Sequence, residues 1–241
     1  MHRDDTPACP TYPESVSTQE RIERSPGRLA MIAGGVGLLL AVGLGLLVTL
    51  RVANPDGLDA TWMEEIVEHR SSFWEVPARV FDFIGGGWFS VFAIPFGISL
   101  IFLLIRRPWA AAAFLAGCAV SGGVVQLMKI GFGRARPEEI LLQIESPSFP
   151  SGHTANAATV VFLLALLLRR SWILIPGIVY VILMALSRTY LGAHWVTDTI
   201  GGALLGAAMA VLVWALFAVK VRRERPERAD SGSGAEPAAQ Q

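Results

Sequence analysis

Residues 29–50 read LAMIAGGVGLLLAVGLGLLVTL, an uncharged run of 22 residues between Arg28 and Arg51. A helix needs about 20 mostly apolar residues to cross the hydrocarbon core of a bilayer, which is about 30 Å thick. The run is longer than the apolar region of a signal peptide, and Arg51 does not suit a small-residue cleavage site. The sequence therefore predicts a membrane-spanning helix that stays in the protein.

Five further uncharged runs of similar character follow. They are Phe83–Ile105, Pro108–Met128, Gly152–Leu168, Ser171–Ser187 and Thr199–Val219. The chain is 53% hydrophobic and only 17% charged, which is more apolar than a soluble domain of this length needs to be. We therefore expect an all-α fold, a six-transmembrane helix bundle with an interfacial helical segment between the first two spans.

The segment from Arg51 to Asp82 supplies that interfacial part. Leu58, Trp62 and Ile66 recur in it at helical spacing among many acidic residues, a pattern typical of an amphipathic helix that lies in the membrane interface. A loop helix packed against the bundle would have the same amphipathic pattern. Both interpretations stay open at this point.

The two ends of the chain differ from the middle in composition. Residues 1–27 are polar and rich in proline, and residues 221–241 include a Ser-Gly repeat, as expected of a disordered tail and a flexible tail. The expected membrane domain comprises residues 28–220. The two cysteines do not indicate the cellular compartment. Cys9 lies in the polar tail and Cys118 in an apolar run, so a disulfide between them would require one segment to change its environment.

Orientation follows from the basic residues in the short connections. The pairs Arg106-Arg107 and Arg169-Arg170, and the segment 220–223, fall on the same side as the amino-terminal tail. Because Lys and Arg are retained on the cytoplasmic side during insertion, we expect both termini to be cytoplasmic, in a multi-pass protein of the plasma membrane. A formal net charge of zero gives no indication of a nucleic-acid partner, and the oligomeric state stays open.

Three polar clusters interrupt the predicted outer ends of spans three to six. The first cluster, residues 129–137, contains Lys129, Arg134 and Arg136. These cations could simply end a span. Basic residues are nevertheless unfavoured in outer loops, so the cluster indicates an anionic ligand at this membrane face.

The second cluster is Pro150-Ser151-Gly152-His153, which predicts the start of a helix. Ser151 is the expected N-cap, and Gly152 lets the backbone approach a ligand closely. Free backbone N–H groups at a helix start bind phosphate oxygens. A purely structural cap would explain Ser151 but not His153 at the lipid boundary.

The third cluster is Ser187-Arg188, followed by His194 and Asp198. His194 and Asp198 are four positions apart, so both side chains are expected on one helical face. The carboxylate could orient one ring nitrogen and leave the other as a nucleophile, although an interfacial structural contact would look the same. Together the clusters supply cations, a helix start and two histidines, the groups that phosphoryl transfer requires.

These clusters resemble the three-part signature of the type-2 phosphatidic acid phosphatase superfamily. The matching elements are Lys129, six residues and Arg136-Pro137; Pro150–His153; and Ser187-Arg188, five residues, His194, three residues and Asp198. The resemblance covers roughly residues 29–220. It implies a membrane lipid phosphatase that acts at the outer face on a lipid phosphate or pyrophosphate, such as a polyprenyl pyrophosphate, phosphatidate or phosphatidylglycerolphosphate.

The resemblance also implies roles for the signature residues. The expected phosphate-binding residues are Lys129, Arg136, Arg188, Ser151 and Gly152. His194 would attack phosphorus and form a phosphohistidine, Asp198 would orient His194, and His153 would protonate the leaving group. No metal and no other cofactor is implied. The role of Arg134 is left open.

Two alternatives use the same residues differently. A lipid-linked phosphotransferase would pass the phosphoryl group to an acceptor other than water, and a transporter or lipid-binding protein would bind the anion without turnover. Glycines in the third and sixth spans, Gly122-Gly123, Gly202 and Gly206, predict close helix packing.

Overall fold

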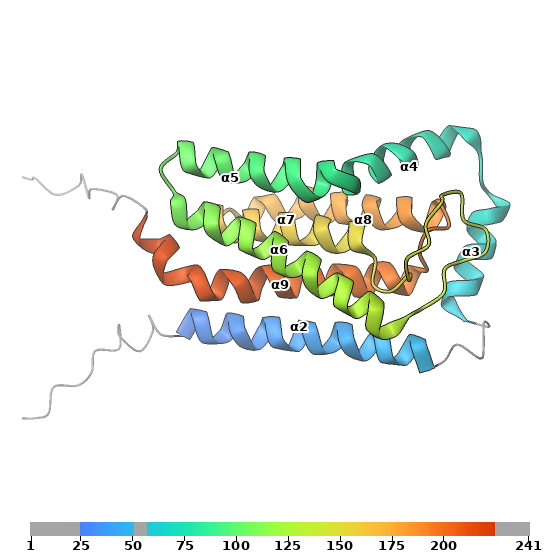
Figure 1. The fold of residues 1–241 in the computed structure, drawn as a ribbon, viewed down its shortest axis with the longest axis horizontal. Coiled ribbons are helices and arrows are strands. Elements are labelled where there is room, and N and C mark those ends of the chain that lie inside the picture. Colours follow the sequence, from blue (N-terminus) through green and yellow to red (C-terminus); the bar gives the residue numbers. More distant parts are fainter. Residues whose placement is uncertain (1–24, 51–56, 225–241) are drawn as a thin grey trace, which may run out of the picture.

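The computed structural model describes residues 25–50 and 57–224, and within these ranges the chain forms helices and no strand (Figure 1). The all-α prediction is therefore confirmed for this part of the chain. The first helix, α2 (Ser25–Leu50), and the last, α9 (Val196–Arg223), each extend three residues beyond the predicted domain of residues 28–220. The tails predicted for residues 1–27 and 221–241 lie, apart from these helical residues and Glu224, outside the described residues.

Among the described residues, four helices are long and apolar enough to cross a membrane. They are α2, α6 (Pro108–Phe132), the segment Ser171–Tyr190, which includes η2 (Ser171–Ile173) and α8 (Leu174–Tyr190), and α9. A fifth candidate is a bent pair, formed by α4 (Ser72–Gly85) with η1 (Phe89–Ala93) and α5 (Ile94–Leu104). The apolar helix α7 (Gly152–Leu168) has only 17 residues, so a sixth span at this place remains a prediction.

The bent pair differs from the straight span that the sequence predicted at Phe83–Ile105. Helix α4 begins at Ser72, passes Asp82 and ends at Gly85, and the two halves meet at 48°. The break falls at Gly85-Gly86-Gly87, where Gly87 has φ +59°, because glycine is the weakest helix former apart from proline and adopts positive φ freely. As a result Asp82 lies inside the helical segment instead of in a loop before it.

The predicted helix around Leu58, Trp62 and Ile66 is present as α3 (Leu58–Glu68). It lies across one end of the bundle, roughly at right angles to the long helices (Figure 1). Its single buried residue is Met63, so most of its surface remains exposed. The position of α3 relative to a membrane surface stays a prediction.

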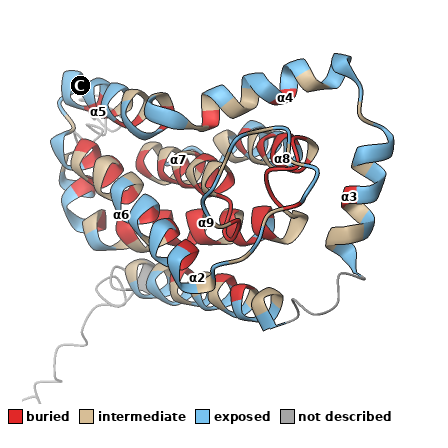
Figure 2. Cartoon of the chain, turned by 45° about the vertical axis from the view of Figure 1, so that its right-hand side comes forward, coloured by how far each residue is buried: buried red, intermediate tan, exposed pale blue. Residues whose placement is uncertain are grey.

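Helix α9 is the central element and packs against α7, α2 and α6. Figure 2 shows many buried residues on α6, α7 and α9, whereas α2 is mostly exposed or half-buried. The predicted close packing at Gly202 and Gly206 is confirmed, since a Cβ at Gly206 would overlap the carbonyl oxygen of Ala155 on α7. The same prediction is wrong for Gly122 and Gly123. A Cβ at either position would have no atom within 4 Å, because both glycines line a cavity.

All three polar clusters lie at one end of the bundle. Helices α6 and α8 end there, α7 and α9 begin there, and the loop at residues 133–151 joins α6 to α7 at the same end (Figure 1). The start of α2 and the end of α9 lie at the opposite end. The up-and-down connection of the helices thus brings together side chains up to 69 residues apart in the chain, from Lys129 to Asp198.

Candidate active site

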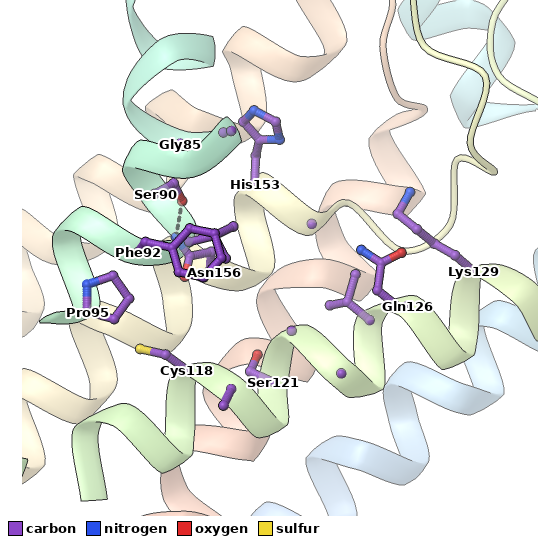
Figure 3. A pocket seen from close by; sticks show the side chains of 18 of the residues that line it. Gly85, Ser90, Phe92, Pro95, Cys118, Ser121, Gln126, Lys129, His153 and Asn156 are labelled. Atoms are coloured by element: carbon purple, nitrogen blue, oxygen red, sulfur yellow. Dashed lines mark hydrogen bonds between the residues drawn. The ribbon is translucent and has the colours of Figure 1, made fainter. Parts of the chain in front are cut away.

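A cavity of about 680 Å³ opens where the three clusters meet. Most of the predicted site residues line it, with Lys129 and His153 facing it from different helices (Figure 3). The lining residues predicted from the sequence are Lys129, Arg136, Gly152, His153, Arg188 and His194. Ser151 and Asp198 are fully buried just behind this wall. The structure therefore brings the predicted residues together at one site.

Two of the cations are held by backbone oxygens of the loop between α6 and α7 and of the turn between α8 and α9. The Lys129 ammonium donates to the carbonyl of Pro147. The Arg136 guanidinium donates to the carbonyl of Ser146 at 2.8 Å and to that of Ala193. Burial lowers the pKa of Arg136 to about 10, so this side chain stays charged at neutral pH. Because neutral carbonyls hold both cations, most of their positive charge remains for an anion.

Arg188 is the most deeply buried cation of the site, with none of its surface exposed. Its Nη1 donates to the carboxylate of Asp82. Its Nε and Nη2 are buried and have no hydrogen-bond partner in the described part of the chain. Unpaired buried donors cost about 1–3 kcal/mol each, and more when charged, so these two N–H groups indicate a place for an anion's oxygen atoms.

His194 lies in the turn between α8 and α9, not on α9 as the sequence predicted. Its Nε2 is 3.4 Å from Nη1 of Arg136. Burial, and the nearby cations Arg136, Arg188 and Lys129, hold the pKa of His194 well below its usual range. The imidazole is therefore neutral at physiological pH and keeps a nitrogen lone pair for nucleophilic attack.

Asp198 occupies the first turn of α9, where its carboxylate accepts from the backbone N–H of Trp195 at 2.9 Å. The same carboxylate oxygen, Oδ2, lies 3.4 Å from Nδ1 of His194, but without hydrogen-bond geometry. Catalytic contacts are often this long in free enzymes and tighten in complexes. The predicted His/Asp pair therefore forms although only its carboxylate lies on the helix, because the capping interaction turns Asp198 back toward His194.

Arg134, whose role the sequence left open, binds Asp198. Its Nη1 donates to Asp198 and, at 2.8 Å, to Thr197, while its Nη2 donates to Asp59 of α3 at 2.7 Å. Asp59 in turn accepts from the backbone N–H of Thr197 at 2.9 Å. This network fixes the carboxylate behind His194, and it ties α3 to the site. A basic residue close to Arg136 was the only sequence signal for it.

Ser151 and Gly152 lie at the start of α7, as predicted. Ser151 is at the N-cap position but makes no side-chain capping hydrogen bond, which differs from the predicted cap. Its backbone N–H instead donates to the carbonyl of Asp198 at 2.9 Å, and its Oγ accepts from Thr154 at 3.2 Å. The start of α7 is thereby attached to the first turn of α9, with Gly152 lining the cavity.

Sequence reasoning missed Asp82, which reaches the site from α4. Its carboxylate lies 3.2 Å from Nε2 of His153 and also accepts from Arg188. His153 is accommodated beside it because Gly85 and Gly86 have no side chains, and a Cβ at Gly86 would overlap His153 Nε2. A signal was present in the sequence, since a single acid directly precedes an apolar run and three glycines follow it.

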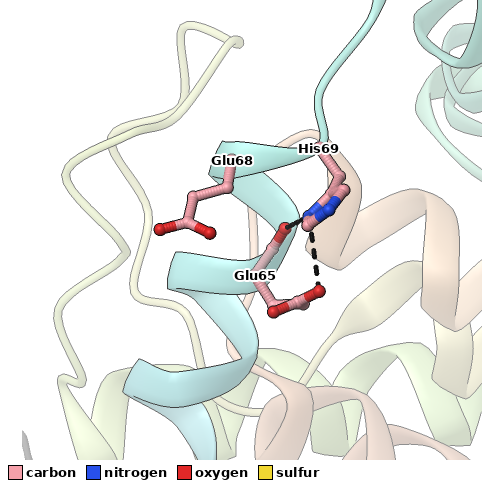
Figure 4. Close-up of side chains that lie close together, drawn as sticks. All are labelled: Glu65, Glu68 and His69. Carbon is pink, nitrogen blue, oxygen red and sulfur yellow. Dashed lines mark hydrogen bonds and ion pairs between the residues drawn. The ribbon is translucent and has the colours of Figure 1, made fainter.

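Another group of potential ligand atoms lies on the outer surface of α3 (Figure 4). One ligand atom from each of Glu65, Glu68 and His69 falls within 4.8 Å of the others, and all three residues are exposed. His69 is already bonded to the carbonyl of Glu65 at 3.0 Å. Exposed acidic groups of this kind are common on helices, and nothing else near them indicates a cation.

Part of the chain is similar to known proteins. Residues 110–222 match the model of the PAP2 superfamily. Phosphatidylglycerophosphatase B of Bacillus subtilis is 34% identical over 131 residues, which are 50% of this chain and 64% of that protein. Decaprenylphosphoryl-5-phosphoribose phosphatase of Mycobacterium tuberculosis is 37% identical over 113 residues, 45% of this chain and 60% of that protein. The chain thus spans less than two thirds of the length of these relatives.

The fold also matches a solved structure. The crystal structure of a transmembrane PAP2-type phosphatidylglycerolphosphate phosphatase from Bacillus subtilis superposes with a TM-score of 0.67 and 25% identity. The match covers 80% of this chain and 98% of that structure. It includes helices before residue 110 as well as the region that matches the family model.

Proposed function

Residues 110–222 match the model of the PAP2 superfamily, and from this premise we propose that the chain is a member of that family and an integral membrane lipid phosphatase. The reaction is hydrolysis of a lipid phosphate or pyrophosphate through a phosphohistidine intermediate. The observation that carries the proposal is that a buried histidine, His194, and a buried arginine, Arg188, line the same cavity, and that Nε and Nη2 of Arg188 have no partner among the described residues.

The proposed first step is attack of His194 on phosphorus. Lys129, Arg136 and Arg188 hold the phosphoryl oxygens, assisted by backbone groups at Ser151 and Gly152. The Nε2 lone pair forms the new P–N bond, and the bond from phosphorus to the leaving oxygen breaks with its electron pair. His153 donates a proton to that oxygen, which departs as the lipid alcohol or as the lipid monophosphate.

The second step regenerates the histidine. Water attacks the phosphohistidine, the P–N bond breaks, and inorganic phosphate leaves while the water proton passes to a base such as His153. Asp198 keeps the imidazole of His194 oriented through both steps. Every group in this scheme is a side chain or backbone group of the chain itself.

The shape of the cavity supports a lipid substrate. From the cations it continues along η1, α5 and α6, where its wall becomes apolar through Phe92, Phe96, Leu115 and Cys118. A polar end beside an apolar passage fits a headgroup whose hydrocarbon tail stays in the bilayer. The two curated relatives are named for a phosphatidylglycerophosphate and a decaprenyl-linked phosphate, so polyprenyl pyrophosphate, phosphatidate and phosphatidylglycerolphosphate are the substrates to test.

We place the active site at the extracytoplasmic face of the plasma membrane, in a bundle of six spans with both termini cytoplasmic. The basic residues of the connections support this orientation, since Arg106, Arg107, Arg169 and Arg170 would all lie on the cytoplasmic side. In this arrangement α7 is the short fourth span, and α3 lies along the outer surface.

The test is phosphate release by the purified protein in detergent, with EDTA present, from each of the three lipids. We expect release by the wild type and none by His194→Ala, with Glu75→Gln on the exposed side of α4 as the control for a neutral surface change. Wild-type release by His194→Ala, or a strict need for a divalent ion, would contradict the mechanism. Label appearing on a second lipid would identify a phosphotransferase, and anion binding without any turnover would identify a transporter.

A further inference from the structure

We propose that Asp82 is a positioning residue, which holds the acid His153 and the phosphate-binding guanidinium of Arg188 in a fixed relation to each other. The inference rests on the proposed function and extends it to a carboxylate outside the three signature clusters. Asp82 does not itself contact the reacting atoms in this proposal. It acts through the two groups that it binds.

A single carboxylate oxygen carries both contacts. Oδ1 of Asp82 lies 3.2 Å from Nε2 of His153 and accepts from Nη1 of Arg188. The backbone carbonyl of the same residue lies 3.2 Å from His153 Nε2 as well. Asp82 therefore meets the imidazole through its side chain and its main chain, which restricts the ring more than one contact would.

The end of α4 creates this arrangement. Asp82 lies in the last turn of a helix that ends at Gly85, where carbonyl groups have no partner further along the helix. The carbonyl of Asp82 is thus free to accept from His153. Gly86 leaves room for the ring, because a Cβ at that position would overlap Nε2. The glycine break and the carboxylate of Asp82 together position the imidazole of His153.

The contacts with Asp82 leave other nitrogen atoms of Arg188 and His153 available to the substrate. Arg188 uses only Nη1 for Asp82, so its Nε and Nη2 remain for phosphate oxygens. His153 uses Nε2, and no residue in the described ranges hydrogen-bonds its Nδ1, which remains for the leaving oxygen. A carboxylate next to a protonated imidazole also stabilises that protonated form, as a proton donor requires.

The inference predicts that the effect of Asp82→Asn depends on the leaving group. Departure of a lipid alkoxide needs a proton, whereas departure of p-nitrophenolate does not. General acid catalysis contributes about 10²–10⁴-fold, so we expect Asp82→Asn to lower kcat for a lipid phosphate monoester by about 100-fold. We expect kcat for p-nitrophenyl phosphate to change by only a few fold, because the amide oxygen of the substituted side chain can still accept from Arg188 and keep it in place. That second substrate also shows that the variant is folded.

Two comparisons sharpen the test. His153→Ala should show the same dependence on the leaving group. Because the two residues are expected to act as a unit, the double variant Asp82→Asn/His153→Ala should lose no more activity than His153→Ala alone. Gly86→Ala should reproduce the pattern without altering any charge, because its Cβ displaces the ring. Gly97→Ala on α5, where a Cβ has open space, and Glu75→Gln on α4 are the matched controls.

The possible outcomes separate the inference from the proposed function. Equal losses on both substrates, no loss on either, or losses that multiply in the double variant would each overturn the role of Asp82. The proposed function would stand in all three cases, provided that His194→Ala is inactive. If His194→Ala retained activity, the proposed function would fail first.

Discussion

At the scale of single residues, the charge around His194 decides its chemistry. Arg136, Arg188 and Lys129 surround an imidazole that is almost completely buried. Cations close to a histidine oppose its protonation, as does burial. The same cations attract the phosphate dianion. In the proposed mechanism, one set of charges therefore keeps His194 unprotonated and binds the phosphoryl group that His194 attacks.

This arrangement predicts the pH dependence of activity. The neutral form of His194 is active, so kcat/KM falls as the pH drops through its pKa, and the lowered pKa moves this acid limb below the ordinary value of about 6.5. Arg136→Gln removes one cation, which should raise the pKa of His194 and move the limb to higher pH. The measurement is the pH profile of kcat/KM for one substrate, so that substrate ionisation cancels.

Arg79→Gln is the control for that profile, because Arg79 pairs with Glu75 on the exposed side of α4. Its acid limb should coincide with that of the wild type. An acid limb of Arg136→Gln that stays in place or moves to lower pH would show that Arg136 does not control the protonation of His194.

Arg134 acts on His194 indirectly, because it binds the carboxylate of Asp198. Asp198 is fully buried, so its charge requires a partner inside the protein. Arg134 is that partner, and it also binds Asp59. Removing one partner of a buried ion pair costs about 3–5 kcal/mol, because the other charge is left uncompensated.

We therefore expect Arg134→Gln to lower both stability and activity. The thermal unfolding temperature in detergent should fall, and phosphate release should fall with every substrate, because Asp198 is no longer fixed behind His194. Asp59→Asn should have a smaller effect of about 1 kcal/mol, since Asp59 is partly exposed and the Arg134–Asp198 contact remains. Equal effects of the two variants would contradict this order.

At the scale of helices, the break between α4 and α5 and the glycines of α6 shape the cavity. The two halves of this span meet at 48°, and α5 packs against α6 whereas α4 packs against α8. Gly122 and Gly123 face the resulting space without filling it. The apolar passage thus depends on two features that leave volume between helices.

A larger side chain in that passage should impair the reaction of substrates with a long hydrocarbon tail more than that of substrates with a short one. Gly122→Leu is expected to lower kcat/KM for a long-chain lipid phosphate by at least about 10-fold, equivalent to about 1.4 kcal/mol, and to leave a short-chain soluble phosphate unaffected. Gly97→Leu places the same side chain in open space outside the cavity and should leave both substrates unaffected. An equal effect of Gly122→Leu on both substrates would argue against a tail in this passage.

At the scale of the whole molecule, the bundle has two chemically different ends. The polar clusters and α3 share one end, while the basic turns 106–107 and 169–170 and the end of α9 lie at the other (Figure 1). This separation is the pattern that the insertion rule for basic residues produces. It supports an outward-facing active site.

Labelling from outside the cell tests this orientation. In a background with Cys9→Ser and Cys118→Ser, we expect Glu145→Cys to react with a membrane-impermeant maleimide on intact cells, and Arg170→Cys to react only after lysis. Both positions are exposed, so access to the aqueous side decides the result. Reaction of Arg170→Cys in intact cells would reverse the proposed topology.

The sequence alone determined the helical class, the extent of most helices and the residues of the three clusters. Apolar runs fix these features locally, because a run of about 20 residues has few alternatives in a bilayer. The signature spacing identified Lys129, Arg136, His153, Arg188 and His194, and all of these line one cavity. Residues 110–222, which contain all three clusters, match the model of the PAP2 superfamily.

Only the tertiary structure revealed Asp82 at the site, Arg134 on Asp198, and the open space at Gly122 and Gly123. Each depends on a contact, or on the lack of one, between helices far apart in the chain, and periodicity within one segment carries no information about its neighbour. Asp82 illustrates the reason, since its contact with Arg188 spans 106 residues. Whether a charge ends a helix or completes a site is decided by the helix that packs beside it.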